Sequence, residues 1–152
     1  MEAFRLSREK YAAPLSGKGA AMKGARWNSI GVEIIYTASN RSLAMAEVAV
    51  HLTLATIPSD YVMVTIHLPD DVSILKLTKA DLPTDWNVFP HPSSTQTVGD
   101  KFINDNKHCL LQIPSVVTQG DYNLLINPYH SEFSKIKIIK IEKFPFDKRI
   151  FK

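Results

Sequence analysis

The sequence predicts an α+β fold in which a curved, largely antiparallel sheet is flanked by a few helices. Segments of strand composition outnumber helical ones, and the two kinds do not alternate regularly. The sequence contains neither GxGxxG nor a P-loop, so it lacks the usual motifs of nucleotide-binding parallel sheets. A chain of 152 residues that is 45% hydrophobic can bury one core, and we expect a single domain over residues 1–152.

The expected strands are short runs rich in β-branched and aromatic residues, bounded by turn-forming residues. They fall at residues 4–6, 32–37, 61–68, 110–117, 122–126 and 136–141, with further candidates at 72–77 and 146–151. Residues 14–24 are glycine-containing and residues 81–94 are proline-containing, so both segments are expected to be loops.

Two helices are expected. The first, at residues 42–54, is rich in Ala and Leu, lacks Gly and Pro, and follows Ser39 or Asn40 as an N-cap. The second covers residues 95–106 and directs Val98, Phe102 and Ile103 inward.

Glu47 is the most informative residue of the first helix. Apolar side chains surround the helix on nearly all sides, which predicts that it is buried. An ionised carboxylate in such a place costs several kcal/mol unless it is paired or hydrogen-bonded. Two interpretations remain open, a structural ion pair and a functional carboxylate.

The formal net charge of +3 is modest, and part of it lies in residues 135–152, where lysines alternate with isoleucines. This pattern predicts a strand with a solvated basic face, or a weak surface for anions. No arginine cluster with exposed aromatic residues accompanies it, so we expect no direct nucleic-acid binding.

The N-terminus lacks the basic and then apolar pattern of a signal peptide. The longest apolar run, residues 43–57, contains Glu47 and His51 and is too short to span a bilayer. Cys109 is the only cysteine, which excludes a disulfide within the chain. We therefore expect a cytoplasmic protein without a membrane partner.

Several blocks of the chain together resemble a known family. In order they are Gly24-Ala25-Arg26-Trp27-Asn28, Gly31, Tyr36-Thr37-Ala38, Ala46-Glu47, Ile113-Pro114-Ser115-Val116-Val117 and Asn123-Leu124-Leu125-Ile126-Asn127-Pro128-Tyr129-His130. The set resembles the RES domain, a family of toxins from bacterial toxin–antitoxin pairs whose fold is related to ADP-ribosyltransferases. The resemblance covers nearly the whole chain. Ala25 departs from it, because many relatives have a second glycine at this position.

The resemblance implies a set of site residues. Its Arg, Glu and Ser match Arg26, Glu47 and Ser115, which become the candidate catalytic residues. Arg5, Arg26 and Tyr36 become candidates for binding NAD⁺. The segment between the strand at 61–68 and Ser115 is too variable for any assignment.

The implied reaction is cleavage of NAD⁺ between nicotinamide and ribose. A carboxylate near the ribose stabilises the oxocarbenium-like transition state, and an arginine fork suits the pyrophosphate. Water or phosphate is the leading acceptor, because no second acid lies close to Glu47 in the sequence. Transfer of ADP-ribose to a protein is the first alternative. The second is a binding module without activity, in which Glu47 and Arg26 merely pair.

Structural explanations stay open for individual residues. Arg26 and Trp27 could form a cation–π pair, Tyr36 could fill the sheet, and Ser115 could close a strand. His51 lies one helical turn after Glu47, but a third ligand is missing and we expect no metal.

The resemblance also implies a partner, a helix-turn-helix antitoxin of the Xre type. The oligomeric state stays open between a homodimer and a hetero-oligomer with this antitoxin.

Overall fold

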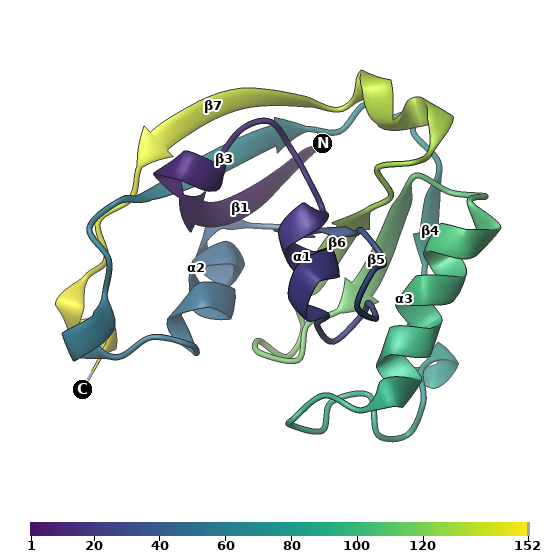
Figure 1. Cartoon of the computed structure of the whole chain (residues 1–152), viewed down its shortest axis with the longest axis horizontal. Helices are drawn as coiled ribbons and strands as arrows, with labels where there is room; N and C mark the ends of the chain where they lie inside the picture. The colour runs from purple at the N-terminus through teal and green to yellow at the C-terminus, as the bar shows by residue number, and fades with distance from the viewer. Residues whose placement is uncertain (152) are drawn as a thin grey trace.

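A computed structural model describes residues 1–151, which form one seven-stranded sheet with helices packed against it (Figure 1). The strands are β1 (Glu2–Arg8), β2 (Ile35–Ala38), β3 (Tyr61–His67), β4 (Ile74–Lys76), β5 (Leu110–Pro114), β6 (Tyr122–Ile126) and β7 (Lys137–Lys143). Their order is β4-β5-β6-β2-β1-β3-β7, and only the pair β4–β5 is parallel. The expected α+β class with a largely antiparallel sheet is confirmed.

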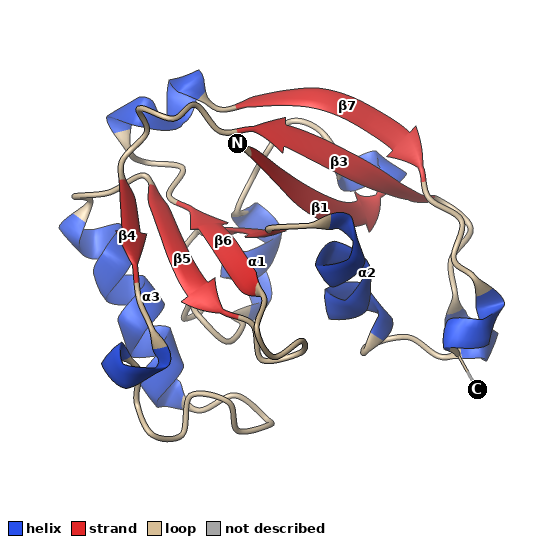
Figure 2. Ribbon diagram, turned by 180° about the vertical axis from the view of Figure 1, so that it is seen from behind, coloured by secondary structure: helices blue, strands red, loops and turns tan. Residues whose placement is uncertain are grey.

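The sheet is bent, since β1, β3 and β7 run across the direction of β4, β5 and β6 (Figure 2). A single register pair, Phe4 with Ala38, joins these two strands, whereas β1 pairs with β3 along its whole length. Such sparse pairing lets the β1–β3–β7 part diverge from the β2–β6–β5–β4 part. The curvature that the sequence predicted is concentrated at this junction.

Helix α2 (Arg41–Ala49) begins at Asn40, whose side chain accepts a 2.8 Å hydrogen bond from the Leu43 N–H. Leu43 and Ala44 are buried against the β1–β3 part of the sheet. The expected helix was wrong in length and in burial. It ends at Ala49 rather than at residue 54, and Val50 is 60% exposed. Met45 and Val48 in its second turn also pack against this cluster, but Val50 and Leu54, which continue the apolar pattern, are largely exposed.

Helix α3 (Ser93–Asp105) is confirmed, with Phe102 and Ile103 buried against Leu111 and Leu125. Tyr36 and its cross-strand partner Leu125 belong to the core cluster of α3, whereas Ala38 belongs to the cluster of α2. Tyr36 and Ala38 lie two residues apart on β2, so their side chains point to the same face. Helices α2 and α3 therefore pack on the same face of the sheet. Tyr36, on the middle strand β2, packs in the same cluster as Trp27 and as Ala20 of the short helix that precedes this strand.

Other expectations needed correction. Residues 14–24 are not wholly a loop, since Lys18–Lys23 form the short helix α1. The expected strand at 32–37 begins only at Ile35, and that at 110–117 ends at Pro114. Residues 146–151 form no strand; Lys148–Ile150 are a 3₁₀ turn. In this tail Phe146 makes edge-to-face contacts with Tyr61, Phe144 and Phe151, so aromatic packing replaces strand pairing.

β7 is an edge strand, and its lysines are exposed as expected. Ile139 and Ile141 on the same strand are also largely exposed. Within residues 1–151, no helix is both long and apolar enough to cross a membrane.

Candidate active site

Glu47 and Ser115 lie in contact, although 68 residues separate them in the chain. Ser115 follows β5 and is buried, while Glu47 is half-buried near the end of α2. The Ser115 Oγ accepts hydrogen bonds from the N–H groups of Val117 (3.1 Å) and Thr118 (3.0 Å). Since its acceptor positions are used, its own hydrogen is directed to Glu47 Oε1, 3.2 Å away.

Burial raises the pKa of the Glu47 carboxyl above its usual value. Hydrogen bonding to Asn123 and Ser115 and the charges of His51 and Arg26 act in the opposite direction. The Asn123 amide, on β6, also donates to the Thr37 carbonyl at 3.3 Å. Burial is the larger effect, so the folded protein holds the Glu47 proton more tightly than usual, and these neighbours only partly offset it.

Arg26 projects from a tight turn that the main chain closes between Ala25 and Asn28, with N···O distances of 3.0 and 3.4 Å. Its Nη1 donates 2.9 Å hydrogen bonds to the carbonyls of Trp86 and Val88. Burial lowers the pKa of Arg26, and the charge of Glu47 opposes this shift. Among the described residues no ion pair of 4.0 Å or less joins Arg26 to Glu47.

Tyr36 connects the sheet to this turn. Its hydroxyl accepts a 3.0 Å hydrogen bond from the Trp27 N–H and donates a 2.6 Å bond to Asn28 Oδ1. Burial raises the pKa of this hydroxyl, which stays neutral. Tyr36 is therefore more than filler of the sheet face, because it fixes the turn that carries Arg26.

Arg5 is not brought to this cluster. It pairs with Val64 in the sheet, which directs it to the face opposite Phe4 and Ala38. Its Nη1 donates to the Ser16 carbonyl at 3.4 Å, and burial lowers the pKa of its guanidinium. A role for Arg5 in binding NAD⁺ stays a prediction.

Two structural roles considered for site residues, a pair of Glu47 with His51 and a cation–π pair of Arg26 with Trp27, can be compared with the structure. His51 is exposed and acts on Glu47 only through its charge. Trp27 is buried against α3, and the cation–π contacts within residues 1–151 join Lys10 to Tyr11 and Arg41 to Phe4, not Arg26 to Trp27.

Sequence patterns did not identify Gln96 or the carbonyls of Trp86 and Val88, which hold Arg26 and its turn. Backbone carbonyls are present at every residue, so the residue type does not indicate which carbonyl will bind the arginine. Asn28 could have been found, because it lies in the Gly24–Asn28 block. In the structure it is fully buried.

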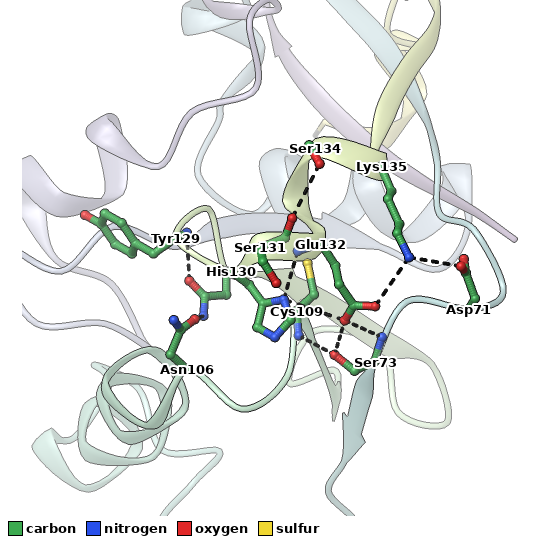
Figure 3. A network of polar contacts seen from close by, with 11 residues as sticks. Asp71, Ser73, Asn106, Cys109, Tyr129, His130, Ser131, Glu132, Ser134 and Lys135 are labelled. Atoms are coloured by element: carbon green, nitrogen blue, oxygen red, sulfur yellow. Dashed lines mark hydrogen bonds and ion pairs between the residues drawn. The ribbon is translucent and has the colours of Figure 1, made fainter.

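A second polar cluster lies away from this site, around Glu132 (Figure 3). Glu132 accepts a hydrogen bond from the Ser73 N–H at 3.0 Å and contacts Lys135 and His130. The Cys109 N–H donates to Ser73 Oγ at 3.0 Å. These bonds tie the segment after β6 to the starts of β4 and β5, which is a structural role.

Asn127 and His130 accept hydrogen bonds within the turns that follow β6. Asn127 accepts from the Tyr129 N–H, and His130 Nδ1 accepts from the Glu132 N–H. Across residues 1–151 no three His, Cys, Asp or Glu side chains come together as a metal site would require. Surface hollows of about 390 and 420 Å³ border α3, but neither is lined by Glu47, Arg26 or Ser115.

Comparison with known proteins gives a consistent result. The family model of the RES domain matches residues 2–147. A protein of Sphingobium sp. (strain YBL2) named "Prs ADP-ribosylating toxin" is 37% identical, over 96% of this chain and 92% of its own. A "Toxin Res" of Yersinia enterocolitica is 33% identical, over 99% of both chains.

Among solved structures, the crystal structure of the M. tuberculosis MbcT–MbcA toxin–antitoxin complex contains a similar chain. The TM-score is 0.77 at 22% identity, and the match covers 94% of this chain and 83% of the other. At this identity the likeness concerns the fold.

Proposed function

Because this chain belongs to the RES domain family, we propose that it is the toxin of a bacterial toxin–antitoxin pair and that it cleaves NAD⁺ between nicotinamide and ribose. The observation that carries the proposal is the environment of the Glu47 carboxylate. It is partly desolvated and accepts a hydrogen bond from Ser115, yet it forms no ion pair with Arg26.

In the proposed reaction the bond between ribose C1′ and the nicotinamide nitrogen breaks, and its electron pair leaves with nicotinamide. Positive charge develops on the ribose, and Glu47 stabilises that charge. A water oxygen then bonds to C1′ and loses a proton to solvent, which gives ADP-ribose. Inorganic phosphate in place of water gives ADP-ribose that carries a phosphate on the same carbon.

Arg26 is assigned to the pyrophosphate. Both hydrogens of its Nη1 are used by the Trp86 and Val88 carbonyls, which leaves the Nε and Nη2 side free. This side offers two parallel N–H donors, a geometry suited to phosphate oxygens. Ser115 orients Glu47 and is not assigned as a nucleophile.

The test is incubation of the purified protein with NAD⁺, with nicotinamide and the ADP-ribose product separated by chromatography. Glu47→Gln should lose at least about 100-fold in turnover because only the charge is removed. Glu9→Gln, in an exposed turn, is the matched control and should keep full activity. Equal turnover by Glu47→Gln and the wild type would remove Glu47 from the chemistry.

Transfer of ADP-ribose to a protein is the second candidate function. The Sphingobium relative is named for ADP-ribosylation of Prs, and this supports the candidate. Adding a Prs protein and labelled NAD⁺ distinguishes the two functions. Label on the protein that depends on Glu47 favours transfer, whereas free ADP-ribose with unlabelled protein favours hydrolysis.

An inactive binding module has less support, since it requires that Glu47 and Arg26 pair directly. The proposed partner is a helix-turn-helix antitoxin of the Xre type encoded beside the toxin. Co-purification of the two proteins, with loss of NAD⁺ cleavage in the complex, would test this.

A further inference from the structure

One face of α3 packs against the turn that carries Arg26 and forms hydrogen bonds with it. Gln96, Gly99 and Asp100 share this face because residues three and four apart lie together on a helix. The Gln96 Nε2 donates to the carbonyls of Ala25 and Asn28, at 3.1 and 3.2 Å. These carbonyls lie on either side of Arg26.

The second contact involves Asp100. Its carboxylate accepts hydrogen bonds from the N–H and the hydroxyl of Ser29, the former at 2.9 Å. Ser29 directly follows the turn, so Gln96 and Asp100 together hold it at both ends.

Gly99 makes this close approach feasible. A Cβ atom on Gly99 would lie 1.6 Å from the Trp27 carbonyl oxygen and 2.7 Å from the Trp27 carbonyl carbon. Backbone atoms cannot give way as a flexible side chain can. Glycine is therefore required for α3 to lie directly on the turn.

The segment before α3 completes the arrangement. Trp86 and Val88, whose carbonyls bind Arg26 Nη1, lie just upstream of the helix. One continuous stretch, residues 86–100, thus holds both the backbone and the side chain of Arg26.

We propose that α3 and the loop before it form a positioning device for Arg26, with Gln96 as its central positioning residue, and that they set the free edge of the guanidinium for a pyrophosphate. This inference rests on the proposed function. Gln96 does not itself touch the substrate. It acts by fixing the backbone on which Arg26 stands, and Tyr36 supports the same backbone from the sheet.

The test uses ADP-ribose, which contains the pyrophosphate and undergoes no cleavage at a nicotinamide bond. Its dissociation constant is measured by calorimetry for the wild type, Gln96→Met and Thr97→Ala. Met matches the length of Gln but has no N–H donor. Thr97 is exposed on the same helix and donates only to Ser93 within it, so it is the matched control.

We expect Gln96→Met to weaken ADP-ribose binding about 10-fold or more, because small misplacements of a binding group are costly. The KM for NAD⁺ should rise in parallel while kcat changes much less. Combining Gln96→Met with Arg26→Lys should add little to the loss caused by Arg26→Lys alone, since both changes act on one interaction. Additive losses, or unchanged affinity in a folded Gln96→Met protein, would overturn the inference.

The melting temperature is recorded for each variant. If Gln96→Met does not fold, Gln96→Ala replaces it, because Ala favours the helix and also lacks the donor. The outcomes separate the two proposals. A wild type that neither releases nicotinamide nor binds ADP-ribose contradicts the proposed function, whereas a wild type that binds it no better than Gln96→Met contradicts only the positioning role.

Discussion

The hydroxyl of Ser115 is directed at the carboxylate of Glu47 by the loop in which it lies. The N–H groups of Val117 and Thr118 occupy the acceptor side of its Oγ, and the 3.2 Å bond to Glu47 uses its hydrogen. A residue that follows the end of a strand thereby also orients the candidate catalytic carboxylate. This relationship explains how Ser115 can matter without acting as a nucleophile.

Ser115→Ala should lower kcat about 10- to 100-fold, the range expected for losing a hydrogen bond to a charged group. That bond lowers the pKa of Glu47, so its loss should move the acidic limb of the pH–rate profile to higher pH. Ser134→Ala is the control, because Ser134 is exposed and donates only to Ser131 within its own turn. An unshifted acidic limb would contradict the orientation of Glu47 by Ser115.

The raised pKa of Glu47 also predicts how stability depends on pH. The folded state holds this proton more tightly than the unfolded state, so Glu47 weakens stability as the pH rises through the interval from its unfolded to its folded pKa. Glu47→Gln should thus unfold at higher urea concentration than the wild type at pH 8. The difference should shrink below about pH 4, near the usual pKa of Glu. A less stable variant at pH 8 would show that Glu47 contributes a net stabilising interaction.

Arg26→Lys should raise the KM for NAD⁺ about 10-fold or more, with a smaller effect on kcat. A lysine cannot replace the bonds to the Trp86 and Val88 carbonyls and offer a planar fork at the same time. Steady-state kinetics provide the measurement. Arg149→Lys, at an exposed arginine far along the chain, should leave both constants unchanged. Wild-type affinity for NAD⁺ in Arg26→Lys would remove Arg26 from the phosphate site.

Tyr36→Phe should reduce the free energy of unfolding by about 1–3 kcal/mol, because the buried Asn28 and the Trp27 N–H lose a partner. The KM for NAD⁺ should also rise, since the turn that carries Arg26 is loosened. Urea denaturation with parallel kinetics measures both effects. Tyr122→Phe, at a largely exposed tyrosine, should change neither. Full stability in Tyr36→Phe would mean that water replaces the lost hydroxyl.

Gly99→Ala should destabilise the protein by at least about 1–3 kcal/mol, because the added methyl group overlaps the Trp27 carbonyl. Gly19→Ala is the opposite case. Gly19 lies in α1 with open space around it, so alanine should be neutral or add about 0.5–1 kcal/mol. Thermal denaturation of the pair measures the difference. Equal melting temperatures would show that α3 shifts away from the turn at little cost.

Local patterns predicted the parts of the fold in which packing agrees with periodicity. The strand at 61–68, the strand at 122–126 and the helix at 95–106 all formed close to their expected limits. Expectations failed where an apolar run extended past the sheet that could cover it. Val50 and Leu54 continue the helical pattern but lie beyond the end of α2 and beyond its residues that pack on the sheet.

Glu47 was singled out on the premise of a buried helix, which was wrong for most of α2. The carboxylate is nevertheless partly desolvated, because Ser115 and Asn123 approach it from other parts of the chain. The identity of the residue was therefore readable from the sequence, while the cause of its burial was not.

The residue types of the candidate site and their order follow from local blocks of the chain, in which Arg26, Tyr36, Glu47 and Ser115 lie. Which of these residues meet depends on the folded arrangement. Register places Tyr36 beneath the turn of Arg26 and directs Arg5 to the other face, since one position along a strand reverses a side chain. Folding also brings α3 onto that turn, where Gln96 binds backbone carbonyls. Every residue has a carbonyl, so the residue types of the turn do not indicate this contact.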